Sequence, residues 1–589
     1  MFICLHSRQS LLMMLLFCLL PATAVLAQTA EETLTTLFTD EWEARLAGNP
    51  GLAASMGDVE AAGRIIDVSP AAVAAQAQQD ARFLERLAAI SYEALSDESR
   101  LNYDLFKFIL EDRVRAAARK AWRIPFLSDS GFHTALSGAV ESTRADNEAQ
   151  VEAYLRRLAA IPAHINQQID NMRVGLRDGY TQPAAIMAKI EPSFAALAVD
   201  AVEESVFFSP FQRLSENIPD AQQAALTAQG REIIQSRVLP AFKTLYQFIS
   251  QEYTPAARTT LGASDLPDGE AYYQSLIAYF TTLDLTAAEV HAIGQREAAR
   301  IRAEMEAIIE EVEFAGTFAE FLSFLRTDPQ FYAQSARELL MEAAWIAKRT
   351  DEVMPAFFKT LPRDPYGVRA VPDAIAPNYT TGRYWGGIPG VRGGLFMVNT
   401  YNLKERPLYT LPALALHEGV PGHHHQIALS KELKNVPEFR RRFYLSAFGE
   451  GWGLYCERLG EEMGIYENAY ERFGRLTYEM WRAGRLIVDT GIHAMGWTRQ
   501  QAVNFFLENS ALAEHNINTE VDRYISWPGQ ALAYKIGELK IVELRQKAES
   551  ALGDAFDIRE FHDAILRNGT VPLGVMAHQV DRYIATASK

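Results

Sequence analysis

Long segments with the composition and spacing of α-helices constrain the fold of this chain more than any other feature. One segment begins with Ser69, a typical N-cap residue, and Pro70 at the first helical position. Thr286 and Glu289 form a capping-box pattern at the start of another segment. Further helices are predicted near residues 146–177, 218–253, 333–358, 438–464, 467–495 and 498–513. The fold is therefore expected to be mainly α-helical.

One stretch, residues 361–411, departs from the helical pattern and is rich in Gly, Pro, Tyr and Asn. Within it, "GLFMVNTY" at 394–401 predicts a strand, a small β element before the histidine-rich segment. Its aromatic residues favour a binding loop, and a linker between helical halves is the alternative. We place a boundary near 360, between a helical N-terminal half (28–360) and a C-terminal half (361–589) of one integrated unit.

The N-terminus has the pattern of a secretory signal peptide. Arg8 supplies the positive charge, residues 11–20 are almost unbroken apolar sequence, and small residues precede a cleavage point after Ala27. The apolar run is too short for a comfortable membrane span. Phe17 before Cys18 argues against a lipid anchor. Residues 1–27 are thus expected to be removed, leaving a soluble exported protein, periplasmic or secreted, with no membrane partner.

The composition of the remaining chain excludes two further classes. Cys456 is the one cysteine left, so an internal disulfide is not available to the fold. Loss of Arg8 changes the formal net charge from −17 to −18. Such acidity argues against a nucleic-acid partner, which would require a basic footprint.

The segment "HEGVPGHHHQ", residues 417–426, holds four of the twelve histidines of the chain. A catalytic zinc site uses three protein ligands and an open position. The HExxH motif places its two histidines four residues apart on one helix face. Here the fourth residue after His417 is Pro421, which cannot bind a metal.

Neither later histidine fits a regular helix well. His423 would face away from His417, and His424 would return to the same face about two turns further along the axis. We expect Gly419, Pro421 and Gly422 to interrupt the helix, so that an ejected turn returns a later histidine to the metal. A histidine-rich surface turn is the alternative, but "LPALAL" before the cluster and "QIAL" after it indicate a helix with a buried face.

A second predicted helix, "SAFGEGWGLYCERLGEEMG", supplies acidic residues. Glu450 and Glu457 are seven positions apart and so lie on nearly one face, with Trp452 and Tyr455 beside them. Glu450 is the candidate third ligand. Glu457 would hold a ligating imidazole through its other nitrogen. Solvent contact is the alternative for both.

Six motifs together resemble the bacterial family known as domain of unknown function 885, which is grouped with zincin-type peptidases. They are "LPDGEAYY" (266–273), "PGVRGGLFMVNTY" (389–401), "HEGVPGHHHQ" (417–426), "FGEGWGLYCE" (448–457), "VDTGIHAMGW" (488–497) and "YISWPGQALAYKIG" (524–537). The family resembles helical gluzincins such as carboxypeptidase Taq and the thimet oligopeptidases. That resemblance implies a mostly helical fold split by a deep channel. The loop before "GGLFMVNTY" departs from the family pattern, which leaves the choice of substrate open.

The resemblance also assigns ligands. Set against the HExGH motif of those gluzincins, "HEGVPGH" contains two inserted residues, which makes His423 the second ligand. His424 also follows the family pattern and stays as the alternative, whereas His425 is not expected to bind the metal. The downstream glutamate of the gluzincins corresponds to Glu450.

Two further stretches are expected to line the site or hold a substrate. Arg485, Asp489 and His493 are spaced by four on one helix face, although a buried polar network explains them as well. Ser526 and Pro528 are expected to start a helix near Gln530 and Tyr534. Because related zinc peptidases stabilise the oxyanion with a Tyr or His, Tyr534 is the first candidate for that role, ahead of Tyr524 and Arg523. Core packing explains either tyrosine almost equally.

The sequence thus predicts an exported zinc peptidase with ligands His417, His423 and Glu450. Zinc would polarise the scissile carbonyl and lower the pKa of a water, whose proton Glu418 would take as general base. A strand over 396–400 would pair with an extended peptide. Short peptides are the expected substrates, rather than folded proteins.

Two alternatives stay open. A zinc amidohydrolase acting on a small non-peptide amide would need the same site. A non-enzymatic helical binding protein would have a structural or lost metal site, and His424 as a fourth ligand would support it. Glu418 opposes that second alternative, since a structural site has no use for a base.

Overall fold

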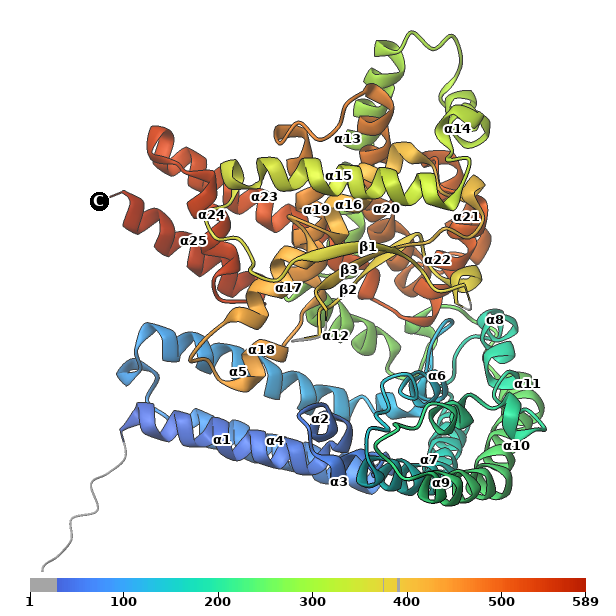
Figure 1. Cartoon of the computed structure of the whole chain (residues 1–589). Coiled ribbons are helices and arrows are strands. Elements are labelled where there is room, and N and C mark those ends of the chain that lie inside the picture. The colour runs from blue at the N-terminus through green and yellow to red at the C-terminus, as the bar shows by residue number, and fades with distance from the viewer. Residues whose placement is uncertain (1–28, 374, 389–391, 589) are drawn as a thin grey trace, which may run out of the picture.

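The computed structural model describes residues 29–373, 375–388 and 392–588. The predicted signal peptide lies outside them. The predicted fold class is confirmed: the chain is mainly helical, with one small three-stranded sheet. Most of the early helices occupy the lower part of Figure 1, and most of the later helices lie with the sheet in its upper part.

The early part of the chain is helical throughout. Its helices are α1 (Ala30–Gly48), α2 (Pro50–Ser55), α3 (Val59–Ala62), α4 (Pro70–Ala88), α5 (Asp97–Ala118), α6 (Phe132–Gly138), α7 (Glu148–Asp178), α8 (Ala184–Ala195), α9 (Asp220–Ile233), α10 (Leu239–Phe248), α11 (Thr254–Ala256), α12 (Gly269–Thr281), α13 (Ala287–Glu311), α14 (Phe318–Thr327) and α15 (Ala336–Phe357).

The later part begins with the sheet and continues as helices. It comprises β1 (Tyr366–Ala370), β2 (Gly382–Trp385), β3 (Gly394–Val398), α16 (Leu411–Glu418), α17 (His423–Glu432), α18 (Glu438–Arg442), α19 (Ser446–Glu462), α20 (Ala469–Ala494), α21 (Arg499–Asn509), α22 (Glu514–Ser526), α23 (Ala533–Leu552), α24 (Ile558–Leu566) and α25 (Leu573–Ala587).

Both predicted helix starts are confirmed. The Ser69 hydroxyl accepts the Ala72 N–H at 3.3 Å at the start of α4. At the start of α13, Thr286 and Glu289 each accept the backbone N–H of the other, at 3.2 and 2.8 Å. These side chains occupy donors that have no partner within the first helical turn.

Two predicted boundaries are wrong. The helix expected over 438–464 is divided into α18 and α19, because residues 443–445 are extended and place Leu445 in the core. Ser526 ends α22 instead of starting a helix. Pro528 disfavours helical geometry at the preceding residue, Trp527, and Gly529 then takes a positive φ of 81° before α23.

The sheet has the order β1-β3-β2, with β1 parallel and β2 antiparallel to β3. Every residue of β3 is buried, in keeping with its central place. The prediction that residues 396–400 pair with a peptide substrate is therefore wrong, because both edges of β3 are taken by neighbouring strands. A peptide could add only to β1 or β2.

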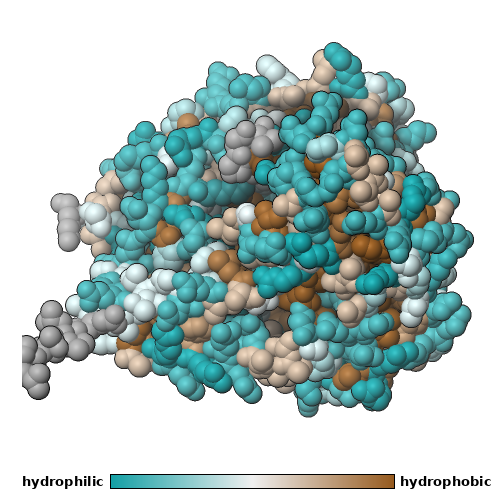
Figure 2. Space-filling model, turned by 60° about the horizontal axis from the view of Figure 1, so that its bottom comes forward, coloured by the Kyte–Doolittle hydropathy of each residue, from teal (hydrophilic) through white to brown (hydrophobic). Residues whose placement is uncertain are grey.

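Both halves of the chain share one core. The main cluster of buried apolar side chains runs from Leu34 on α1 to Val580 on α25. Hydrophilic side chains cover most of the face seen in Figure 2, and hydrophobic ones gather toward its middle. Across the described residues, each helix is too short or too polar to cross a membrane.

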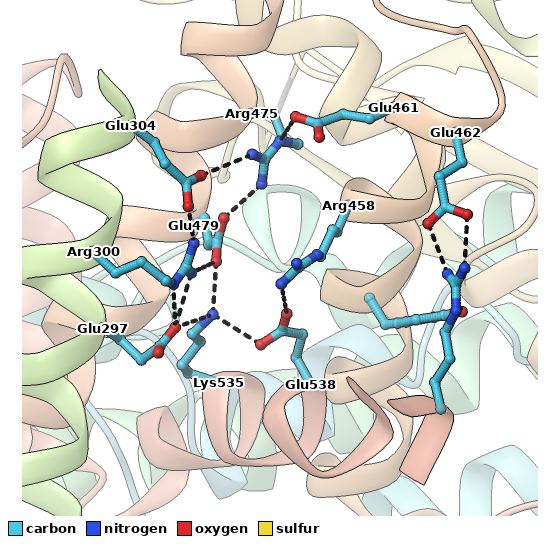
Figure 3. Close-up of polar contacts among 12 residues, drawn as sticks. Glu297, Arg300, Glu304, Arg458, Glu461, Glu462, Arg475, Glu479, Lys535 and Glu538 are labelled. Atoms are coloured by element: carbon cyan, nitrogen blue, oxygen red, sulfur yellow. Dashed lines mark hydrogen bonds and ion pairs between the residues drawn. The ribbon is translucent and has the colours of Figure 1, made fainter. Parts of the chain in front are cut away.

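A buried ion-pair network joins α13, α20 and α23 (Figure 3). The ammonium group of Lys535 on α23 lies 2.8 Å from both Glu479 and Glu538, and 3.0 Å from Glu297. Burial opposes the charged form of Lys535, but these carboxylates outweigh it and raise the pKa of the lysine. The lysine and Glu479 are almost fully buried, so each charge depends on its partners.

We predict that Lys535→Met lowers the free energy of unfolding by about 3–5 kcal/mol, because it leaves buried carboxylates without their cation. Lys540→Met is the matched control on the same helix. Its partner Glu543 is exposed, so a loss of less than about 1 kcal/mol is expected. Urea unfolding followed by circular dichroism measures both. Equal losses in the two variants would contradict the role of the network.

Candidate metal centre

The helix that carries the histidines is interrupted where the sequence predicts it. Helix α16 ends at Glu418 and α17 begins at His423. The His424 N–H donates to the Gly419 carbonyl at 3.1 Å, so the chain re-enters a helix almost at once. At Gly422 a Cβ would lie 2.0 Å from the His417 carbonyl oxygen, so only glycine fits there.

The interruption brings three side chains together. His417 from α16, His423 from α17 and Glu450 from α19 each offer one ligand atom, and these atoms lie within 4.8 Å of one another. The Nε2 atoms of the two histidines lie 3.3 and 3.4 Å from the same Glu450 oxygen. Two imidazole nitrogens and a carboxylate oxygen form the donor set that a catalytic zinc ion uses, so the residues present fit that ion.

The second ring nitrogen of His417, Nδ1, contacts a carboxylate on the side away from Glu450. Nδ1 lies 2.8 Å from the Glu457 carboxylate, which also lies 3.4 Å from the Arg482 guanidinium. Gly453 allows this contact, since a Cβ there would lie 2.7 Å from the imidazole. Glu457 thus occupies the position predicted for it. Arg482 was not among the predicted site residues, although its place one helical turn before Arg485 on α20 was a usable signal.

The electrostatics of the cluster favour a positive charge in its centre. Burial lowers the pKa of His417, but hydrogen bonds to Glu450 and Glu457 outweigh it and raise the pKa to about 9. Burial likewise raises the pKa of Glu450, but His423 and His417 outweigh it and hold that pKa well below the usual value. A bound cation would take the place of the proton on the imidazole.

Glu418 lies against the sheet. One oxygen of its carboxylate accepts the Tyr384 N–H of β2 at 2.7 Å. Because the Tyr384 N–H points away from β3 and donates to Glu418, the free edge of β2 faces the glutamate. The Tyr444 hydroxyl donates to Glu450 at 3.4 Å. Tyr444 was not predicted as a site residue, because it lies in the break between α18 and α19, where a continuous helix was expected.

The other two histidines of the segment lie outside the cluster. The nitrogens of His424 contact the Tyr384 hydroxyl at 3.1 Å and the Asp364 carbonyl oxygen at 2.9 Å. His425 contacts the Thr360 carbonyl oxygen at 3.1 Å. The structure therefore groups His423, and not His424, with His417.

The predicted polar face of α20 is a buried network. His493 accepts the Ala263 N–H at 3.0 Å and contacts the Tyr524 carbonyl oxygen at 2.9 Å. Asp489 accepts hydrogen bonds from the Tyr273 hydroxyl and the Gly529 N–H. Burial raises the pKa of Asp489 to about 7 and lowers that of His493 to about 3. Both side chains are fully engaged with protein groups.

Arginines and aromatic rings from α20, α22 and α23 form the rest of this region. The Tyr524 hydroxyl is buried and takes hydrogen bonds from Trp481 and Arg485, both at 2.8 Å. Gln530 accepts a hydrogen bond from Arg523 at 2.6 Å. Tyr534 is half-buried, with its ring 4.3 Å from the Arg485 guanidinium carbon. Of the two predicted tyrosines, Tyr534 is the one with exposed surface.

Helix α23 is held close to the ligand helix. At Gly451 on α19 a Cβ would lie 2.5 Å from the Cα of Gly537 on α23. Tyr534 stands one turn before Gly537, so this contact places it near Glu450. Tyr444, whose hydroxyl donates to Glu450, and Tyr534 therefore both lie near this glutamate.

A family model described as "Bacterial protein of unknown function (DUF885)" matches residues 50–580. The chain belongs to this family. No curated protein matches this DUF885 chain. A solved structure described as a "putative lipoprotein" from Colwellia psychrerythraea is 26% identical, with a TM-score of 0.86 over 95% of this chain and 100% of the other.

A second solved structure, described as a "putative lipoprotein of unknown function" from Shewanella oneidensis, is 17% identical. Its TM-score is 0.73 over 94% of this DUF885 chain and 99% of the other, which shows that the fold is shared.

The two neighbouring histidines provide a test of the ligand set. We predict that His423→Ala removes stoichiometric zinc, because two remaining ligands rarely hold the ion, whereas His424→Ala keeps most of it. Metal content of the purified variants measures this, with circular dichroism as the check on folding. Loss of zinc in the His424 variant alone would show that His424, and not His423, is the second ligand.

Glu520 provides a test of the buried charge pairing with Arg485 and Arg523. Burial raises its pKa, but Arg523 and Arg485 outweigh it and lower the pKa to about 2 from the usual 4.5. Its contribution to stability is therefore complete above pH 4.5 and is lost as the pH falls toward 2. We predict that Glu520→Gln costs about 3 kcal/mol near neutral pH. The difference from wild type should shrink below pH 4.5 in urea unfolding; a difference independent of pH would contradict the charge pairing.

Proposed function

We propose that the protein is a zinc-dependent peptidase that hydrolyses short peptides. One observation carries the proposal: three ligand atoms of His417, His423 and Glu450 converge within 4.8 Å, directly beside Glu418. Three protein ligands leave a coordination position for a water or a substrate oxygen. The same donor set and the helical fold support a relation to the gluzincin peptidases.

The chain offers a group for each remaining task. When bound, zinc would polarise the scissile carbonyl and lower the pKa of a nearby water. Glu418 takes the proton of the attacking water and passes it to the leaving amine. The Tyr384 N–H holds one oxygen of that carboxylate, which orients it. Tyr534, with Tyr444 as a second donor, is the group proposed to stabilise the developing oxyanion.

The free edge of β2 is the proposed place for the substrate backbone. It faces Glu418 through Tyr384, and edge strands accept extended peptides by main-chain hydrogen bonding. This assignment replaces the one that put the peptide on β3. Restriction to short, unfolded peptides through a deep channel stays a prediction.

The alternative of a structural metal site is less well supported. A structural zinc ion requires four protein ligands. The nearest further histidine, His424, has both nitrogens engaged with Tyr384 and Asp364. We also propose that the protein is exported, since both similar solved structures are described as lipoproteins.

We predict that Glu418→Gln keeps zinc and fold while turnover of short peptides falls by several orders of magnitude, because the amide cannot take the water's proton. Glu432→Gln is the matched control: it changes a glutamate of α17 that pairs with Arg363 at the surface, and its turnover should stay near wild type. A peptide-library digest analysed by mass spectrometry gives the rates. Near-wild-type turnover in the Glu418 variant would show that another group is the base.

A further inference from the structure

Arg485 and Arg523, which lie beside Tyr534, carry more positive charge than their protein partners neutralise. Arg485 and Arg523 share one carboxylate, Glu520, at 3.0 and 2.9 Å. Asp489 also interacts with Arg523, but burial raises the pKa of this carboxyl to about 7. Among the described residues, Glu520 is the one carboxylate within ion-pair distance of either guanidinium group.

The hydrogen bonding of Arg485 is also incomplete. Its Nε donates to Tyr524 and its Nη2 donates to Glu520, but Nη1 is buried and has no hydrogen-bond partner. A buried charged donor without a partner is costly, so such a group calls for a ligand. Arg523 keeps 11% of its side chain exposed, against 3% for Arg485, and gives the pair an opening.

This pair adjoins the proposed catalytic site. The Tyr534 ring lies 4.3 Å from the Arg485 guanidinium carbon, and Tyr534 stands one helical turn before Gly537, which packs against Gly451 beside Glu450. A ligand held by the arginines would thus have its next atoms near the metal ligands. Two guanidinium groups in a dry setting suit a carboxylate, which accepts paired hydrogen bonds from arginine.

We infer that Arg485 and Arg523 form a subsite for a substrate carboxylate, so that this enzyme prefers peptides whose free C-terminus lies close to the scissile bond. The inference rests on the proposed peptidase function for its consequence in catalysis. The half-buried Tyr534 ring lies over the Arg485 guanidinium, so a carboxylate that reaches Nη1 would have to displace this ring. The enzyme would then release residues from the C-terminal end rather than cut peptides internally.

The test compares N-acetyl-trialanine with its C-terminal amide. Zinc-loaded Glu418→Gln protein, which should bind without turnover, is titrated with each peptide by calorimetry, and kcat/KM is measured for the wild type. We expect the free acid to bind at least about tenfold more tightly than the amide, since it alone forms charge-assisted hydrogen bonds. The same preference is expected in kcat/KM.

Variants locate the effect. Arg485→Gln and, as a second variant, Arg523→Gln should bring the acid-to-amide ratio close to one. Arg499→Gln should keep the wild-type ratio, because Arg499 pairs with Asp522 instead. Equal binding of acid and amide in the wild-type background, or a preference that survives both arginine substitutions, would overturn the inference. If acid is preferred but neither peptide is hydrolysed, the subsite stands and the proposed hydrolysis fails.

Discussion

The break between α16 and α17 is the constraint on which the site depends. In an unbroken helix His423 would point away from His417, and no ligand set could form. The four residues from Gly419 to Gly422 end one helix and start the next, and they place both imidazoles against Glu450. The Trp452 indole donates to the Pro421 carbonyl at 2.8 Å, so the ligand helix α19 also holds the break in place.

Much of the site could be predicted because its parts obey local rules. The capping residues of α4 and α13 form hydrogen bonds with their own first turn, so short-range sequence is sufficient. The glycines and the proline after His417 also predicted the helix interruption from local sequence alone. Glu450 and Glu457 were found because a regular helix puts them on one face.

The remaining features depend on contacts between distant segments. In the observed strand order β3 pairs with β1 and β2, so it has no free edge for a substrate. This order cannot be read from the sequence of β3 itself. Tyr444 reaches Glu450 only because residues 443–445 leave the helix. The shared use of Glu520 by two arginines likewise depends on how α20 meets α22. Spacing along one helix cannot show which charges from another helix face it.

The contact between Gly451 and Gly537 has a consequence for how the site responds to its ligands. The backbones of α19 and α23 are so close here that no side chain fits between them, and the two helices pack in direct contact. Glu450 and Tyr534 are then pre-organised relative to each other before any cation or peptide arrives. Little backbone entropy is left to lose on binding at these two positions, and adaptation to different substrates depends on side-chain rotation, that of the Tyr534 ring included, and on the edge of the sheet.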